Sequence, residues 1–300
     1  MPLSKSPSDD FIHRFFFDHT DLRGEIVTLQ TSFQTATAHH PQHPVTQRIL
    51  GEFFAAVSLL AGVLKFEGML TLQIRGNGII PVIMAEATHE RKIRGIVQGD
   101  PNVNFDEYAD AELRELVGDG VLTITIDPTD GQRYQGIIAI DGTNLAECLS
   151  HYFAQSEQLP TRLWLSADGR TAGGLLLQAL PPTGDRKFDN NLREEEWNHA
   201  VQLANTVKSE ELFNLPHAEL LYRLFNEFEL RLMPPEQAEF YCNCSRQRSG
   251  HALLSLGEED AYELLTEQPV ISINCQFCGQ EYVFQKSDLA DIFHPQQSVH

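Results

Sequence analysis

Four cysteines near the C-terminal end constrain this chain more than any other feature of its sequence. Cys242 and Cys244 form a Cys-x-Cys pair, and Cys275 and Cys278 form a Cys-x-x-Cys pair further along. The chain has five cysteines in all, so four unrelated free thiols would not be expected to gather in this way. Four thiolates complete the tetrahedral shell of a structural zinc ion. The pattern therefore predicts one Zn²⁺ ion per chain, held by these four side chains.

The chemistry of such a site leaves two interpretations open. Four sulfur ligands occupy every coordination position, so the metal is not expected to activate water. It would then be a structural zinc that supports a module too small to fold on its own core. Alternatively, the thiolates would be oxidised to local disulfides, and the module would lose its metal and its fold together. The spacing alone favours the structural interpretation.

Composition and charge exclude several classes of protein. The net charge is −20, from 42 acidic and 22 basic residues, and it disfavours binding to nucleic acids. The N-terminal residues lack the apolar stretch of a secretory signal, and the longest uncharged apolar run, residues 53–64, is too short to span a bilayer. We therefore expect a cytoplasmic protein without a membrane partner. In that reducing compartment, clustered cysteines indicate metal or redox chemistry rather than structural disulfides.

Residue patterns predict an α+β N-terminal domain over residues 1–188. Runs rich in Ile, Val and Thr indicate strands at residues 24–30, 69–76, 79–85, 92–98, 121–127, 135–141, 161–167 and 173–180. Helices are expected over residues 44–65, 111–117 and 143–158. The strands come mostly in consecutive runs, which predicts a largely antiparallel sheet with packed helices. Cys148 has apolar neighbours at helical spacing, so we expect a buried packing residue.

Two smaller parts are expected to follow this domain. Turn-forming residues at 181–191 mark the start of a helical linker, residues 189–241, in which two amphipathic helices would carry Trp197 and Leu220. The apolar stripes of these helices have no core of their own, so they must lie on another part of the chain. Residues 242–300 are expected to form a small C-terminal zinc-binding domain. It would contain two short helices, a β-hairpin around the second cysteine pair and a last helix capped by Ser287.

Several longer motifs accompany the cysteines. They are LKFEG at residues 64–68, TLQIRGNG at residues 71–78, SEQLPTRLWL at residues 156–165, AGGLLLQALP at residues 172–181, and CNCSRQR and CQFCGQEYVF around the cysteine pairs. With these motifs the chain resembles the redox-regulated bacterial chaperones of the heat shock protein 33 family, the 33 kDa chaperonins. The resemblance runs from about residue 11 to residue 280.

This resemblance implies a holdase chaperone that is inactive when it is reduced and bound to zinc. Oxidation is then expected to join Cys242 to Cys244 and Cys275 to Cys278, so that zinc is released and the linker unfolds. The exposed apolar surface would hold unfolding client proteins during heat and oxidative stress without ATP, and the active protein would be a homodimer. In this scheme the N-terminal domain binds substrates and dimerises, the linker acts as a lid, and the chain is not an enzyme.

Two other functions fit parts of the sequence. A thiol oxidoreductase can carry a Cys-x-x-Cys motif, although that motif normally begins a βαβ unit. A protein-binding module with a purely structural zinc site is the second alternative. The histidine-rich stretch of His39, His40 and His43 is interpreted as a solvated loop rather than as an acid–base cluster. Client aggregation measured with reduced and with peroxide-treated protein would separate these functions.

Overall fold

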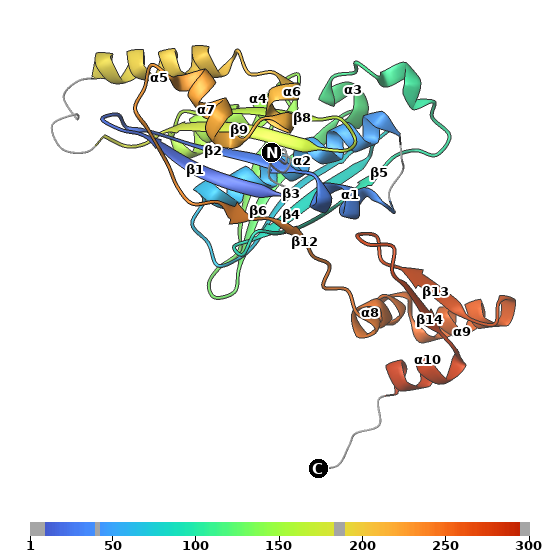
Figure 1. Cartoon of the computed structure of the whole chain (residues 1–300). Coiled ribbons are helices and arrows are strands. Elements are labelled where there is room, and N and C mark those ends of the chain that lie inside the picture. Colours follow the sequence, from blue (N-terminus) through green and yellow to red (C-terminus); the bar gives the residue numbers. More distant parts are fainter. Residues whose placement is uncertain (1–9, 40–42, 183–189, 295–300) are drawn as a thin grey trace, which may run out of the picture. The chain divides into compact units, whose positions relative to one another are not determined.

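The structure is a computed structural model that describes residues 10–39, 43–182 and 190–294. The chain divides into two compact units, Met1–Tyr241 and Cys242–His300 (Figure 1). The predicted turn-rich boundary at residues 181–191 lies mostly outside the described residues. Within the described ranges, no helix is both long and apolar enough to cross a membrane.

Two largely antiparallel sheets form the framework of the first unit. Sheet A has the strand order β10-β1-β2-β9-β8, and β11 also pairs with β1. Its strands are β1 (Phe11–Phe17), β2 (Leu22–Leu29), β8 (Thr161–Ala167), β9 (Ala172–Ala179), β10 (Leu230–Leu232) and β11 (Glu236–Gln237). The predicted α+β class and the largely antiparallel pairing are confirmed, although the strands divide between two sheets where one was expected.

Sheet B has the strand order β12-β5-β4-β3-β6-β7. Its strands are β3 (Gly68–Gly76), β4 (Val82–Thr88), β5 (Lys92–Gln98), β6 (Gly120–Pro128), β7 (Tyr134–Ile138) and β12 (Glu239–Phe240). Only the pairing of β12 with β5 is parallel among the described strands. The long loop between β5 and β6 holds the 3-10 turn η1 (Phe105–Tyr108) and the helix α3 (Leu113–Val117).

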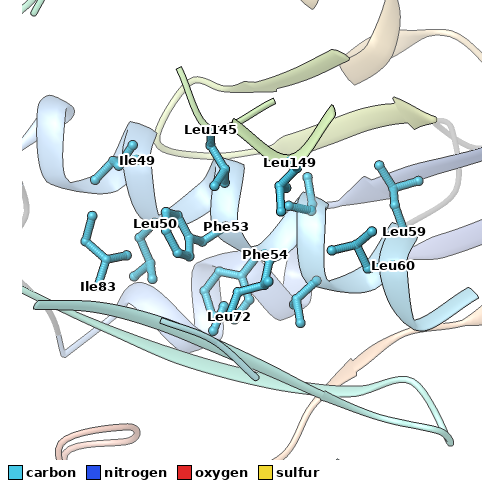
Figure 2. Close-up of a cluster of buried hydrophobic side chains, with 14 of the residues drawn as sticks. Ile49, Leu50, Phe53, Phe54, Leu59, Leu60, Leu72, Ile83, Leu145 and Leu149 are labelled. Carbon is cyan, nitrogen blue, oxygen red and sulfur yellow. The ribbon is translucent and has the colours of Figure 1, made fainter. Parts of the chain in front are cut away.

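The helix α2 (Pro44–Val63) lies between the two sheets and contacts strands of both. The His43 side chain caps its first turn by accepting a hydrogen bond from the Val45 amide, and Pro44 has the fixed φ that suits a first helical position. The helix is apolar on nearly every side, as is typical of a helix buried on all sides. Figure 2 shows its side chains facing sheet B on one side and α4 (Leu145–Tyr152) on another.

The end of α2 is held by three arginines from the surrounding strands and loops. Arg91, Arg14 and Arg23 donate hydrogen bonds to the carbonyls of residues 61, 62 and 63, respectively. These carbonyls have no partner within the helix, so the guanidinium groups satisfy them in the interior. Arg14 also binds the buried Glu25 carboxylate at 2.9 Å. Burial nevertheless raises the pKa of Glu25 to about 7.

Sheet A separates two apolar clusters, because successive side chains of a strand point to opposite faces. On β2, Val27 faces the main core around α2, whereas Ile26 faces the other way. We call this second side of the sheet the covered face. Its buried residues are Phe15, Phe17, Leu22, Ile26, Leu175 and Leu177.

The linker supplies the other half of the cluster on the covered face. It contains α5 (Asn190–Ala204), α6 (Ser209–Asn214) and α7 (His217–Phe225), followed by β10, β11 and β12. Three helices therefore stand where two were expected, and the last part of the linker is extended rather than helical. The buried linker residues on this face are Ala200, Ala204, Leu212, Leu220, Leu221, Leu224 and Phe225. Both tryptophans of the chain, Trp164 and Trp197, pack against the same cluster.

Two short helices complete the first unit. Helix α1 (Thr31–Thr37) follows β2, and α4 continues into the π-helical turn η2 (Phe153–Glu157). Cys148 lies on α4 with none of its surface exposed, as predicted, and burial raises the pKa of its thiol.

The second unit is small and has a small core. It comprises α8 (Arg246–Leu256), α9 (Glu258–Glu267), β13 (Ile271–Asn274), β14 (Glu281–Phe284) and α10 (Lys286–Phe293). Its buried apolar cluster consists of Leu253, Ala261, Ile271, Phe284 and Leu289. The predicted cap of the last helix is wrong by two residues: Gln285 precedes its first turn, and the Gln285 amide donates to the Asp288 carboxylate at 2.7 Å.

Candidate metal centre

The four cysteines of the second unit lie on two short segments that local structure holds in place. Cys242 and Cys244 precede α8, and Ser245 caps this helix, because its hydroxyl accepts a hydrogen bond from the Arg248 amide in the first turn. Cys275 and Cys278 lie in the turn between β13 and β14. Gly279 closes this turn in the left-handed region, with φ of 69°, and its amide donates to the Cys275 carbonyl at 2.8 Å. The hairpin register therefore fixes one pair, and the start of α8 fixes the other.

The structure brings the four sulfurs together. Cys242 Sγ lies 3.6 Å from Cys275 Sγ, and Cys244 Sγ lies 3.5 Å from Cys278 Sγ. All four sulfurs lie within 4.8 Å of one another. A tetrahedral zinc ion with sulfurs about 2.3 Å away would place those sulfurs about 3.8 Å apart. The geometry and the all-sulfur donor set therefore fit a tetrahedral metal ion, and no pair of these cysteines is joined as a disulfide.

The thiols differ in how readily they lose a proton. Burial raises the pKa of the Cys242 and Cys278 thiols. Burial also opposes ionisation of Cys244, but hydrogen bonds from Tyr282 and from the neighbouring thiols outweigh it and lower the pKa of Cys244. The Tyr282 hydroxyl donates to Cys244 Sγ at 3.1 Å. Tyr282 was not predicted to have this role, because in the sequence it is only one of several apolar residues in a strand.

Polar contacts attach the linker to the covered face and its surroundings. Near the start of the linker, Arg193 binds the buried carboxylate of Asp21 at 3.0 Å. Near its end, Glu236 binds Arg91, one of the three arginines that hold α2, at 2.6 Å. These contacts were not predicted from the sequence, because each joins residues far apart in the chain.

A histidine at the start of α7 makes a further contact that no local sequence pattern predicts. His217 is only 3% exposed; its Nδ1 lies 2.8 Å from His13 Nδ1 and its Nε2 lies 2.9 Å from Thr28 Oγ1. The Thr28 hydroxyl donates its single proton to the Leu212 carbonyl, so His217 Nε2 must be the donor to Thr28. His217 Nδ1 is then the acceptor for a proton on His13. The neutral form of His217 therefore satisfies every partner around it.

The histidine-rich stretch does not form a catalytic cluster among the residues described. His43 caps α2 through Nδ1 and lies 3.1 Å from Asp106 through Nε2. His40 lies outside the described residues.

Comparison with known proteins identifies the family. A family model described as Hsp33 protein matches residues 10–285. A 33 kDa chaperonin from Pseudomonas aeruginosa is 50% identical over 285 residues, covering 95% of this chain and 94% of that protein. A 33 kDa chaperonin from Azotobacter vinelandii is 49% identical over 290 residues, with coverage of 95% and 94%.

A solved structure agrees with this assignment at the level of the fold. The crystal structure of a 33 kDa chaperonin from Thermotoga maritima, a heat shock protein 33 homologue, matches with a TM-score of 0.77 and 23% identity. The match covers 94% of this chain and 97% of that one. The chain therefore belongs to the Hsp33 family. The predicted resemblance is confirmed, and the molecule is an Hsp33-type chaperone.

Proposed function

We propose that this chaperone is a redox-regulated, ATP-independent holdase that keeps unfolding proteins from aggregating during oxidative and heat stress. In the reduced state, Cys242, Cys244, Cys275 and Cys278 would hold one Zn²⁺ ion. The ion would supply free energy of folding to a unit whose own apolar core is small. The protein would be cytoplasmic, and it would be a homodimer when active, with residues 1–188 as the client-binding and dimerisation domain.

Oxidation would remove the sulfur ligands in pairs. A thiolate attacks hydrogen peroxide, breaks the O–O bond and becomes a sulfenic acid, with release of hydroxide. The neighbouring thiolate then attacks this sulfur, forms the S–S bond and releases a second hydroxide. Each disulfide thus takes two electrons from the protein and consumes one peroxide. Two disulfides, Cys242–Cys244 and Cys275–Cys278, would leave no thiolate to bind the metal, so the second unit would unfold.

The observation that carries the proposal is the apolar cluster shared by the linker and the covered face. Full burial of a leucine or phenylalanine side chain contributes about 1.5–3 kcal/mol, and the linker buries five of them there. Among the described residues, α5, α6 and α7 have no separate core of their own. They would therefore depend on docking to remain folded. Release of residues 189–241 would expose a continuous apolar face suited to unfolded clients.

The redox half of the proposal is tested by light scattering of a heat-unfolding client protein. Peroxide-treated full-length protein should suppress client aggregation without ATP, and reduced protein should not. Equal activity of the two forms would support the alternative of a protein-binding module with a structural zinc site. A thiol oxidoreductase would instead form, reduce or exchange disulfide bonds in the client protein.

The lid half of the proposal is tested in the full-length, reduced protein. Phe225 on α7 is fully buried in the shared cluster, whereas Tyr222 on the same helix is 72% exposed. Loss of a buried phenylalanine side chain costs about 3–5 kcal/mol, and a buried carboxylate adds to this cost. We expect Phe225→Asp to be active without oxidant and Tyr222→Asp to remain inactive. If both variants are inactive when reduced but active after oxidation, the covered face is not the client-binding surface.

A further inference from the structure

The first strand of sheet A changes its position in the sheet when the linker is released. In the structure, β1 has β2 on one side and the linker strands β10 and β11 on the other. Without those linker strands, β1 becomes the outer strand of sheet A. Its unpaired amides and carbonyls would then be available to another chain.

The linker shows which backbone groups of β1 are available. Phe16 is paired with Arg231, and the two neighbouring contacts continue the same register. The Asp18 amide donates to the Glu229 carbonyl at 2.8 Å, and the Met233 amide donates to the Arg14 carbonyl at 2.9 Å. The outer edge of β1 thus presents alternating donors and acceptors at residues 14, 16 and 18, the pattern of an antiparallel ladder.

The alternate side chains of the same linker segment lie on the side of the covered face. Leu230 is opposite Phe17 and Leu232 is opposite Phe15 in the register of β10 and β1, and Leu230 packs against the apolar cluster of that face. Phe15 and Phe17 belong to β1, so this apolar surface remains when the linker leaves. The segment therefore binds in two ways at once: its backbone extends the sheet, and every second side chain lies on the apolar covered face. Peptides that add a strand to a sheet are recognised in this way.

We propose that the outer edge of β1 binds extended apolar segments of unfolded client proteins by antiparallel strand addition, in the place that β10 occupies in the inactive chain. The inference rests on the proposed function, because the edge is free only after release of the linker. Beyond that function, strand addition specifies how a client is held, namely by backbone hydrogen bonds to β1. Backbone hydrogen bonds need no particular client sequence, and the covered face requires only alternating apolar side chains, so one edge would accept many unfolded chains.

Two peptides with the sequence of residues 227–234 test the inference on peroxide-activated, full-length protein. In the first, the amides of Arg231 and Met233 are N-methylated, which removes the donors that face β1 in the observed register. In the second, the amides of Leu230 and Leu232 are N-methylated, which changes only the opposite edge of the peptide. Both peptides have the same composition and the same number of methyl groups. We expect the first to bind at least about tenfold more weakly than the second.

Hydrogen exchange with an unfolded probe, reduced and carboxymethylated lysozyme, provides the second measurement. The Phe16 and Asp18 amides should exchange rapidly in the activated protein and become protected when the probe is added. Equal affinity of the two peptides, with both amides unprotected under conditions where the probe is bound, would overturn strand addition and leave the chaperone activity intact. Protection before the probe is added would instead indicate that a second copy of the chain occupies the edge, and would also overturn it. If the peroxide-treated protein suppresses no aggregation, the proposed function itself fails.

Discussion

Acidification is expected to weaken the docking of the linker on sheet A, because His217 is buried there as a neutral ring. Its surroundings provide a proton donor at Nδ1, from His13, and an acceptor at Nε2, the Thr28 hydroxyl. A second proton on His217 would put a positive charge into this buried site, and His13 would have to move its own proton to Nε2 in order to accept from His217 Nδ1. No other titratable side chain is hydrogen-bonded to this ring in the part of the chain that the structure describes. Burial, and to a smaller extent His13, lowers the pKa of His217 to about 3.

The size and direction of this pH effect on docking follow from the difference between the pKa of His217 in the docked linker and its pKa in the released linker. In a released linker, His217 would have the ordinary histidine pKa of about 6.5. The released state therefore binds more protons than the docked state at any pH between about 3 and 6.5. Docking has its full stability above about pH 6.5 and loses about 1.4 kcal/mol for each pH unit below it. At pH 5 the loss is about 2 kcal/mol, or about 30-fold in the docking equilibrium.

Tryptophan fluorescence provides the assay, since Trp164 and Trp197 both pack against the cluster that docking buries. Reduced protein is titrated with urea at pH 7 and at pH 5. The midpoint of the transition in which the linker leaves sheet A should move to a lower urea concentration at pH 5. The matched variants are His217→Gln, which cannot titrate, and His199→Gln, which removes a half-buried histidine of the same linker. His217→Gln should lose most of the pH dependence, and His199→Gln should keep it. Equal midpoints at the two pH values in the unmodified chain would show that a neutral, buried His217 does not control docking of the linker.

Metal analysis of reduced Cys278→Ser protein should show that most of its zinc is lost, because three sulfurs no longer close the tetrahedral shell. Cys148→Ala is the control that keeps its metal, and full zinc retention in both variants would exclude the four-sulfur site. Peptide mapping after peroxide should find Cys242–Cys244 and Cys275–Cys278, with Cys148 still a thiol, because burial raises the pKa of that thiol. A crossed pattern, which would follow the two shortest sulfur contacts, would contradict the pairing. A chain that ends at residue 187 should suppress client aggregation even in reductant, because it lacks all three linker helices. If only the full-length oxidised chain is active, the client-binding surface includes the linker itself.

Much of the framework could be predicted from the sequence where the pattern was local. The start of α2 at Pro44, the strand at residues 92–98 and the helices and hairpin of the cysteine unit all agree with the structure. The spacing of the cysteines also predicted that their sulfurs would meet. In each case, neighbouring residues carry the structural information.

The elements that were missed take their structure from distant parts of the chain. Strand β1, with the sequence FIHRFFF, lacks a simple alternation of polar and apolar residues, because the linker covers one of its faces and α2 lies against the other. The linker strands β10, β11 and β12 have two or three residues each, too few to show a pattern. They are extended because the edges of β1 and β5 provide hydrogen-bond partners. The contact of His217 with His13 joins residues 204 positions apart, and no local signal indicates it.

In the proposed cycle, the division of apolar residues between the two faces of sheet A would also determine how quickly the inactive state can return. Among the described residues, Ala238 is the only buried linker residue in the core around α2, so the sheet would persist as a template after the linker leaves. Rewinding short helices on an existing surface takes microseconds, whereas reduction of a disulfide takes seconds to hours. We therefore expect recovery to follow the rate at which the disulfides are reduced and not the rate of refolding. The time for which a client is held would then be set by the reductants of the cell.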